Sequence, residues 1–202
     1  FHGKMGIVIF FYHYSRYTNN LIYEEFAGEL LDEILEEIHD KLPIDFENGY
    51  LGIGWGIEYL FEQKFIDGDT NDILVDIDKK VMERDVGRIS DMSLDNGLEG
   101  VFHYVLSRLR NNEYIAQLFD KEYFDDLFKA SNNIENERIS ESLLSLIYHY
   151  YQCIISKKSN YKPLDYFSSF YCKTTLENNK VYDWKLGLVN GCAGIGLNCM
   201  DI

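Results

Sequence analysis

The residues of this sequence that are best suited to chemistry are polar side chains beside four short glycine motifs. Three of them, His2, Glu47 and Asp95, can act as general acids or bases and are the candidate catalytic residues. Five more are the candidate binding residues: Lys4, Asn48, Asn96, Glu99 and Asn190. Where a motif opens a helix, the N-terminus carries partial positive charge that suits a carboxylate or a peptide oxygen. For any single residue, helix capping is the simpler interpretation, so only the set is a candidate site.

The glycine motifs recur at a regular interval along the chain. Each has the form polar-Gly-x-x-Gly-aliphatic, and the first glycines are Gly3, Gly49, Gly97 and Gly191. The last interval is twice as long as the others, which predicts a degenerate motif near position 144, where 140–145 reads SESLLS. A spacing of about 47 residues is typical of a repeat architecture, with units over 1–46, 47–94, 95–139, 140–188 and a partial unit over 189–202.

Each repeat is predicted to fold as two helices. The segments 7–14, 53–61, 101–109 and 143–151, which follow the motifs, are apolar almost all round, as expected of buried helices. The next segment is amphipathic, most clearly over 21–40, where apolar residues oppose a face rich in Glu and Asp. We therefore predict an all-α fold in a single domain over 1–202: an α/α toroid, as a barrel or open arc of about five helical hairpins. Its inner helices are expected to begin near Lys4, Tyr50, Leu98, Ser140 and Cys192, which places the candidate site at one mouth.

Charge and composition exclude several classes of partner. The net charge of −15 has the wrong sign for binding a nucleic-acid backbone or an anionic membrane. No apolar run approaches the roughly 20 residues of a membrane span. The four cysteines are expected to be free thiols in a reducing cytoplasm. An open arc would leave the flanks of its first and last inner helices uncovered, so a homo-oligomer is one way to bury them.

Two of the motifs carry a resemblance to a known family. The stretches ENGYLGIGWG at 47–56 and VNGCAGIG at 189–196, repeated in phase before buried helices, resemble the lanthionine synthetase C-like (LanC-like) family. The resemblance implies an α/α toroid, usually of seven units, and a peptide substrate or leader peptide as partner. It also implies the addition of a peptide cysteine thiol to dehydroalanine or dehydrobutyrine, with a zinc ion held by two Cys and one His.

The family's zinc motif is not matched in this sequence. The corresponding positions are FHG at 1–3 and VNG at 189–191, so that His2 lacks its cysteine and Asn190 stands in place of the histidine. A catalytic zinc ion needs three protein ligands, and we therefore expect no zinc in the family manner and no other cofactor. The alternative is a displaced zinc site, although buried core residues are the simpler interpretation of the side chains that would form it: His149, Cys153, Cys192 and Cys199.

Three functions remain open on the sequence. The first is peptide modification by a LanC-like cyclase, or peptide binding by a degenerate relative. The second is a carbohydrate-active toroid like the six-hairpin glycosidases. Neighbouring helices lie about 8–10 Å apart, which could hold Glu47 and Asp95 at the roughly 6.5–9.5 Å of an inverting carboxylate pair. The third is a scaffold without catalytic activity.

Overall fold

The structure, a computed structural model, describes residues 3–38, 41–110, 118–134, 139–157, 160–171, 185–189 and 191–200. All regular secondary structure in these ranges is helical, which confirms the predicted all-α class. Over the same ranges, no helix is both long enough and apolar enough to cross a membrane.

A helix begins directly after the first glycine of each described glycine motif. The elements are α1 (Lys4–Thr18), α2 (Ile22–Glu36), α3 (Tyr50–Glu62), α4 (Thr70–Met82), η1 (Val86–Arg88), α5 (Leu98–Arg110), α7 (Lys121–Asn132), α8 (Glu141–Ser156), α9 (Pro163–Phe170) and α10 (Cys192–Cys199). The helices α1, α3, α5 and α10 begin at the residues that the sequence predicts. The degenerate motif also precedes a helix, because Ser140 caps α8 by accepting a hydrogen bond from the Leu143 N–H.

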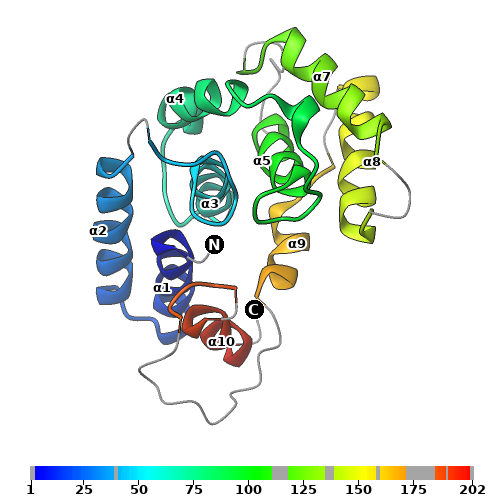
Figure 1. Cartoon of the computed structure of the whole chain (residues 1–202). Coiled ribbons are helices and arrows are strands. Elements are labelled where there is room, and N and C mark those ends of the chain that lie inside the picture. The colour runs from blue at the N-terminus through cyan, green and yellow to red at the C-terminus, as the bar shows by residue number, and fades with distance from the viewer. Residues whose placement is uncertain are drawn as a thin grey trace. The chain divides into compact units, whose positions relative to one another are not determined.

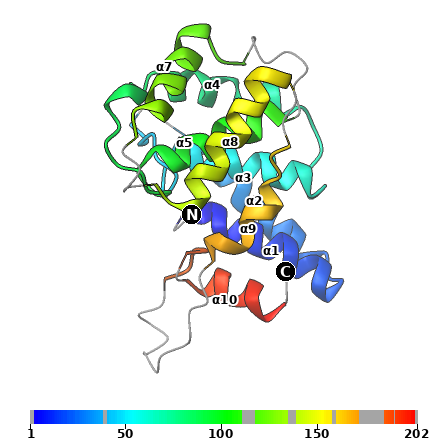
Figure 2. The same cartoon turned by 90° about the vertical axis from the view of Figure 1, so that its right-hand side faces the viewer.

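The chain divides into two compact units. Unit 1 comprises Phe1–Leu42 and Leu164–Ile202, and unit 2 comprises Pro43–Pro163. In unit 1, α1 packs against α2 and α10 (Figures 1 and 2). In unit 2, α3 packs against α4 and α5, α5 packs against α8, and η1 packs against α7. The consecutive pairs α1–α2 and α3–α4 match the predicted hairpins, whereas closure into one toroid and a single domain over 1–202 stay predictions.

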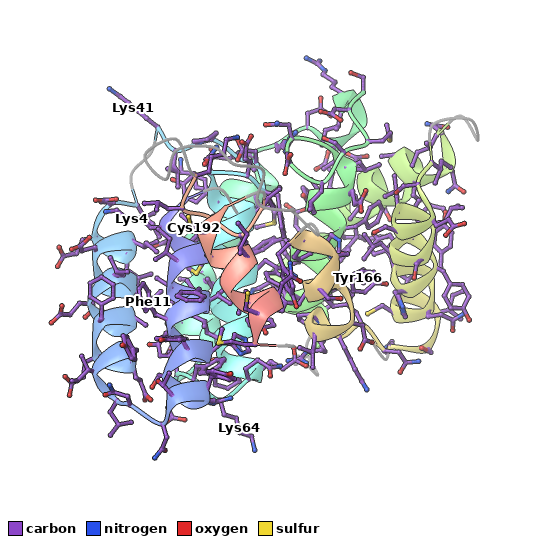
Figure 3. All side chains as sticks on the ribbon, turned by 90° about the horizontal axis from the view of Figure 1, so that it is seen from below. Lys4, Phe11, Lys41, Lys64, Tyr166 and Cys192 are labelled. Carbon is purple, nitrogen blue, oxygen red and sulfur yellow. The ribbon has the colours of Figure 1, made fainter. Side chains whose placement is uncertain are left out.

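Aromatic side chains hold α1 between its two neighbours in unit 1. The Phe11 ring faces α2, where its centroid lies 4.9 Å from that of Phe26 and 6.1 Å from that of Tyr23 (Figure 3). Toward α10, the Phe10 ring occupies the space that a side chain at Gly196 would need. Glycine at this position therefore lets α10 approach α1 closely.

In unit 2, two ion pairs join α3 to α5. Arg108 binds Glu58 at 2.5 Å, with both side chains about 1% exposed. Arg110 binds Glu62, and both are largely buried. The segments 53–61 and 101–109 are largely buried, as predicted, and the charged side chains of Glu58 and Arg108 are buried with them. Since both pairs join the same two helices, a slip of one helical turn (about 5.4 Å) would separate them.

The first glycine of a motif lets a loop fold back over the start of its own helix. A Cβ atom on Gly97 would lie 2.5 Å from the Asp91 carbonyl oxygen and 2.5 Å from the Ser93 backbone nitrogen. On Gly49, a Cβ atom would collide with the Pro43 carbonyl group. Backbone atoms cannot swing aside as a side chain can, so both positions require glycine. The motif thereby positions the loops that precede α3 and α5.

Candidate functional site

The candidate site in unit 2 is built on two loops, 43–49 before α3 and 91–97 before α5. The Asp95 carbonyl oxygen accepts hydrogen bonds from the Phe46 N–H at 2.8 Å and from the Glu47 N–H at 3.2 Å. These bonds join the loops directly, so the candidate catalytic carboxylates Glu47 and Asp95 stand on adjacent backbones. Residues of two successive repeats therefore share one surface.

Arg84, two residues past the end of α4, binds both loops. Its guanidinium donates to the Ile44 carbonyl oxygen of the first loop and, at 2.6 Å, to the Asn96 carbonyl oxygen of the second. Both bonds are charge-assisted and come from one planar group, so the guanidinium sets the separation of the loops. Arg84 is thus a positioning residue, and nothing in the sequence pattern singled it out.

Asn48 and Asn96 occupy equivalent positions, each exposed and each directly before the first glycine of its motif. The prediction that such an asparagine caps its helix is wrong for α3, whose cap residue is Gly49 with no side-chain cap bond. The Asn48 N–H instead donates to the Asp45 carboxylate at 2.8 Å, which fixes the loop. Glu47 and Asp95 are partly exposed, so all four candidate residues of these loops meet solvent.

Lys4 belongs to unit 1, in which it joins α1 to α2. Its ammonium group binds Glu37 at 2.6 Å and Glu33 at 3.2 Å (Figure 3). The hydrogen bonds from Glu37 and Glu33 raise the pKa of Lys4, so it stays charged at neutral pH. Lys4 therefore serves the α1–α2 hairpin in the described structure.

The last three candidate residues are Glu99, His2 and Asn190. Glu99, in the first turn of α5, accepts a hydrogen bond from the Ser140 hydroxyl at 3.2 Å, which ties it toward α8. His2 and Asn190 lie outside the described residues. The structure therefore brings together one subset of the predicted site: Glu47, Asn48, Asp95 and Asn96.

A buried polar group that the sequence analysis did not single out packs against Phe46 of the first loop. Trp55 Nε1–H of α3 donates to the Tyr161 hydroxyl oxygen at 2.8 Å. The same oxygen lies 2.8 Å from Nδ1 of His103 on α5. Since an indole N–H only donates, the Tyr161 hydroxyl oxygen accepts from Trp55 and shares a second hydrogen bond with Nδ1 of His103. All three side chains are at most 1% exposed, so they support the site from within the core.

A second buried polar cluster surrounds Arg108. Besides binding Glu58, its guanidinium donates to Asp78 of α4 at 2.7 Å through Nη2, and the Tyr104 hydroxyl donates to Asp78 at 2.5 Å. Burial disfavours the guanidinium, but hydrogen bonds to Asp78 and its charge outweigh this and raise the pKa of Arg108. One buried cation thus faces two carboxylates and holds α3, α4 and α5 together. The available signal in the sequence was the isolated charge of Glu58 and Arg108 in otherwise apolar segments.

The described donors do not fit a zinc site. Among these residues, no three His, Cys, Asp or Glu side chains converge as ligands of a metal ion would. Of the displaced candidates, Cys153 is buried in unit 2, where desolvation raises the pKa of its thiol. Cys192 and Cys199 belong to α10 in unit 1.

Unit 2 also contains a pocket of about 430 Å³ between the segment 85–92 and α7. Its charged side chains already have partners: Lys129 binds Asp126 at 2.7 Å, and Asp85 binds Arg88 at 2.9 Å. None of the predicted candidate residues lines this pocket. We therefore place the candidate site at the two loops.

Comparisons with known proteins assign no family to the chain. No protein-family model, curated protein or solved structure matches it. The resemblance to the LanC-like family therefore rests on the motifs and their spacing alone.

Two buried histidines indicate that mild acid weakens both units. Burial lowers the pKa of His103 in unit 2 to about 3 and that of His13 in unit 1 to about 4. The reference value is about 6.5, so the unfolded chain takes up these protons first as the pH falls. The stability that each neutral imidazole provides is therefore complete above about pH 6.5 and is lost progressively below it.

We expect the free energy of unfolding to fall by about 1.4 kcal/mol per histidine for each pH unit below about 6.5. Denaturant titrations from about pH 7 to about pH 5.5, where reference carboxylates stay ionised, measure this slope. His103→Asn should flatten the slope for unit 2, and His13→Asn the slope for unit 1. An unchanged slope in either variant would contradict the assignment.

Proposed function

We propose that this chain is a LanC-like protein that binds a peptide at the loops before α3 and α5. The observation that carries the proposal is that the Asp95 carbonyl oxygen and Arg84 join the two loops. The joined loops carry four polar residues that are exposed or partly exposed: Glu47, Asn48, Asp95 and Asn96. The in-phase glycine motifs, each followed by a helix, support the family assignment.

Each group on the loops suits a peptide chain. The side-chain amides of Asn48 and Asn96 can both donate and accept, which matches the N–H and C=O groups of an extended backbone. The carboxylates of Glu47 and Asp95 attract lysine and arginine, and the net charge of −15 steers basic segments toward the protein. The expected ligand is therefore a basic stretch of a substrate or leader peptide.

Binding, rather than rapid thioether formation, is the activity that these residues support. The zinc ligands of the family are not matched in this sequence, so the proposed function includes no step that depends on zinc. A free thiol with a pKa of about 8.5 is only a few per cent ionised at neutral pH. Glu47 or Asp95 would then have to accept the thiol proton, and such a carboxylate is a weak base for this purpose. Any cyclisation is expected to be slow.

The adjacency of Glu47 and Asp95 also supports the runner-up, a carbohydrate-active toroid. An inverting glycosidase needs two carboxyl groups roughly 6.5–9.5 Å apart, of which one protonates the leaving group and the other activates water. The two functions differ in the ligand that depends on the pair. Oligosaccharide binding that is lost with these carboxylates would favour the glycosidase.

Peptide binding is expected to depend on the loop carboxylates. Glu47→Gln combined with Asp95→Asn should raise the Kd for a fluorescently labelled lysine-rich peptide by about tenfold, measured by anisotropy at low salt. The matched control is Asp72→Asn with Asp125→Asn, which removes two exposed carboxylates from α4 and α7 of the same unit. It should leave the Kd within about twofold of the original value.

The two double variants carry the same change in net charge, so their comparison separates a site from general attraction. An equal loss of affinity in both would show that only net charge matters and would contradict the proposal. Absence of measurable binding to the original protein would contradict it as well. A labelled oligosaccharide in the same assay tests the runner-up.

A further inference from the structure

Both connections between the two units leave unit 2 beside the same buried group. The chain passes between the units after Leu42 and again after Pro163. Phe46 lies just past the first connection and Tyr161 just before the second, and each is 1% exposed. Both rings contact His103, with centroid distances of 5.8 Å from Phe46 and 5.9 Å from Tyr161.

Tyr161 and Pro163 are the buried residues of the segment 160–163, and Tyr161 makes its hydrogen bonds to the core of unit 2. Its neighbours Asn160 and Lys162 are exposed, whereas the Tyr161 hydroxyl makes the hydrogen bonds to Trp55 and His103 at 2.8 Å each. Removing such a hydrogen bond destabilises the protein even if the ring stays in place, because the buried polar partners lose their bond. The hydroxyl, and not the ring alone, therefore holds this segment.

The partners of Tyr161 also support the loop that carries Glu47 and Asn48. The Phe46 ring packs on Trp55 at 5.9 Å as well as on His103. A Cβ atom at Gly100 would lie 2.8 Å from Phe46 Cβ, so Phe46 sits tightly against α5. The backbone N–H of Phe46 makes the shorter of the two bonds to the Asp95 carbonyl. Any change in the packing of Trp55 or His103 is thus transmitted to the joined loops.

We infer that the Tyr161 hydroxyl is a latch that positions the candidate site. While it bonds to Trp55 and His103, the loop 43–49 stays joined to the loop 91–97, and release of the segment 160–163 loosens that junction. Tyr161 acts through Phe46 and does not touch the peptide. The consequence for peptide binding rests on the proposed function, whereas the coupling between segment and loop does not.

The first test compares two conservative variants of the full chain by amide hydrogen exchange. Tyr161→Phe removes the latch bonds and keeps the ring. Tyr150→Phe is the matched control, because the Tyr150 hydroxyl is also buried and donates to the Phe124 carbonyl at 2.9 Å, from α8 to α7. We expect exchange of the Phe46 and Glu47 amides to be about tenfold faster in Tyr161→Phe than in Tyr150→Phe. Amides of α7 should not follow this order.

Equal exchange of the loop amides in both variants would overturn the latch, because only general stability would then have changed. A second measurement needs no substitution. In the original protein, the Trp55 indole N–H should be protected from exchange to within about threefold of the Phe46 and Glu47 amides, since one opening exposes all of them. An indole N–H that exchanges more than about tenfold faster would show that the latch opens alone, which also overturns it.

Peptide binding then connects the latch to the site. Tyr161→Phe should raise the Kd for the lysine-rich peptide about fivefold or more, and Tyr150→Phe should leave it unchanged. Faster loop exchange without a change in Kd would overturn the positioning role while the latch itself stands. If the original protein binds no peptide, the proposed function fails, and the exchange measurements still decide the latch.

Discussion

Replacing Arg108 with Met is expected to lower the free energy of unfolding of unit 2 by about 3–5 kcal/mol. The guanidinium is about 1% exposed and binds two buried carboxylates, Glu58 and Asp78. Methionine fills a similar volume, so the main effect is electrostatic: two negative charges remain in the core without their cation. Urea titration, followed by hydrogen exchange in α3, α4 and α5, measures the loss.

Two controls test the electrostatic explanation of the Arg108→Met result. Lys79→Met removes an exposed partner of Asp76 from α4 and should change the free energy of unfolding by less than about 1 kcal/mol. Adding Glu58→Gln and Asp78→Asn to Arg108→Met removes both stranded charges and should recover part of the loss. If the triple variant is less stable than Arg108→Met alone, the cluster acts through packing, and the electrostatic explanation is wrong.

Gly97→Ala is expected to destabilise unit 2 by about 1–3 kcal/mol through overpacking against the backbone. The added Cβ atom would lie 2.5 Å from the Asp91 carbonyl oxygen and 2.6 Å from the Ser93 carbonyl oxygen. The loop must move away from the start of α5 to admit it, and the Asp95 carbonyl moves with the loop. Peptide affinity should therefore fall together with stability.

Gly28→Ala is the matched control for the glycine prediction. Gly28 lies within α2, and its Cβ atom would meet only the Tyr12 hydroxyl at 3.9 Å, an ordinary contact. Alanine is the better helix former, so this variant should gain about 0.5–1 kcal/mol. Thermal unfolding of the two variants should thus shift in opposite directions. A Gly97→Ala protein as stable as the original would show that the loop yields easily.

The helix starts could be predicted from the sequence because their cause is local. Gly49 and Gly97 each face a carbonyl group six residues earlier, Pro43 and Asp91. Such a contact repeats with the motif, so a one-dimensional pattern contains it. The predicted adjacency of two repeats also depended only on the period, which placed Glu47 and Asp95 before successive inner helices.

The contacts that position the site could not be predicted, because they join residues far apart in the chain. The bond from Trp55 to Tyr161 spans 106 residues, and Arg84 binds a carbonyl group 40 residues earlier. The sequence around Trp55, Tyr161 and Arg84 contains no pattern that indicates these contacts. The apolar composition of 143–151 predicted that this part of α8 is buried on most sides. Its side chains Leu144 and Tyr148 are instead more than half exposed.

Unit 1 consists of two chain segments that are far apart in the sequence, so the ribosome synthesises them at different times. The partner of α1 on one side is α10, which begins at Cys192. At roughly 5–20 residues per second, α1 waits on the order of 10 s for that partner to be synthesised. Unit 2 is one continuous stretch, Pro43–Pro163, and can complete its core during this interval. The Phe10 side of α1 is therefore the surface that a nascent-chain chaperone would need to shield.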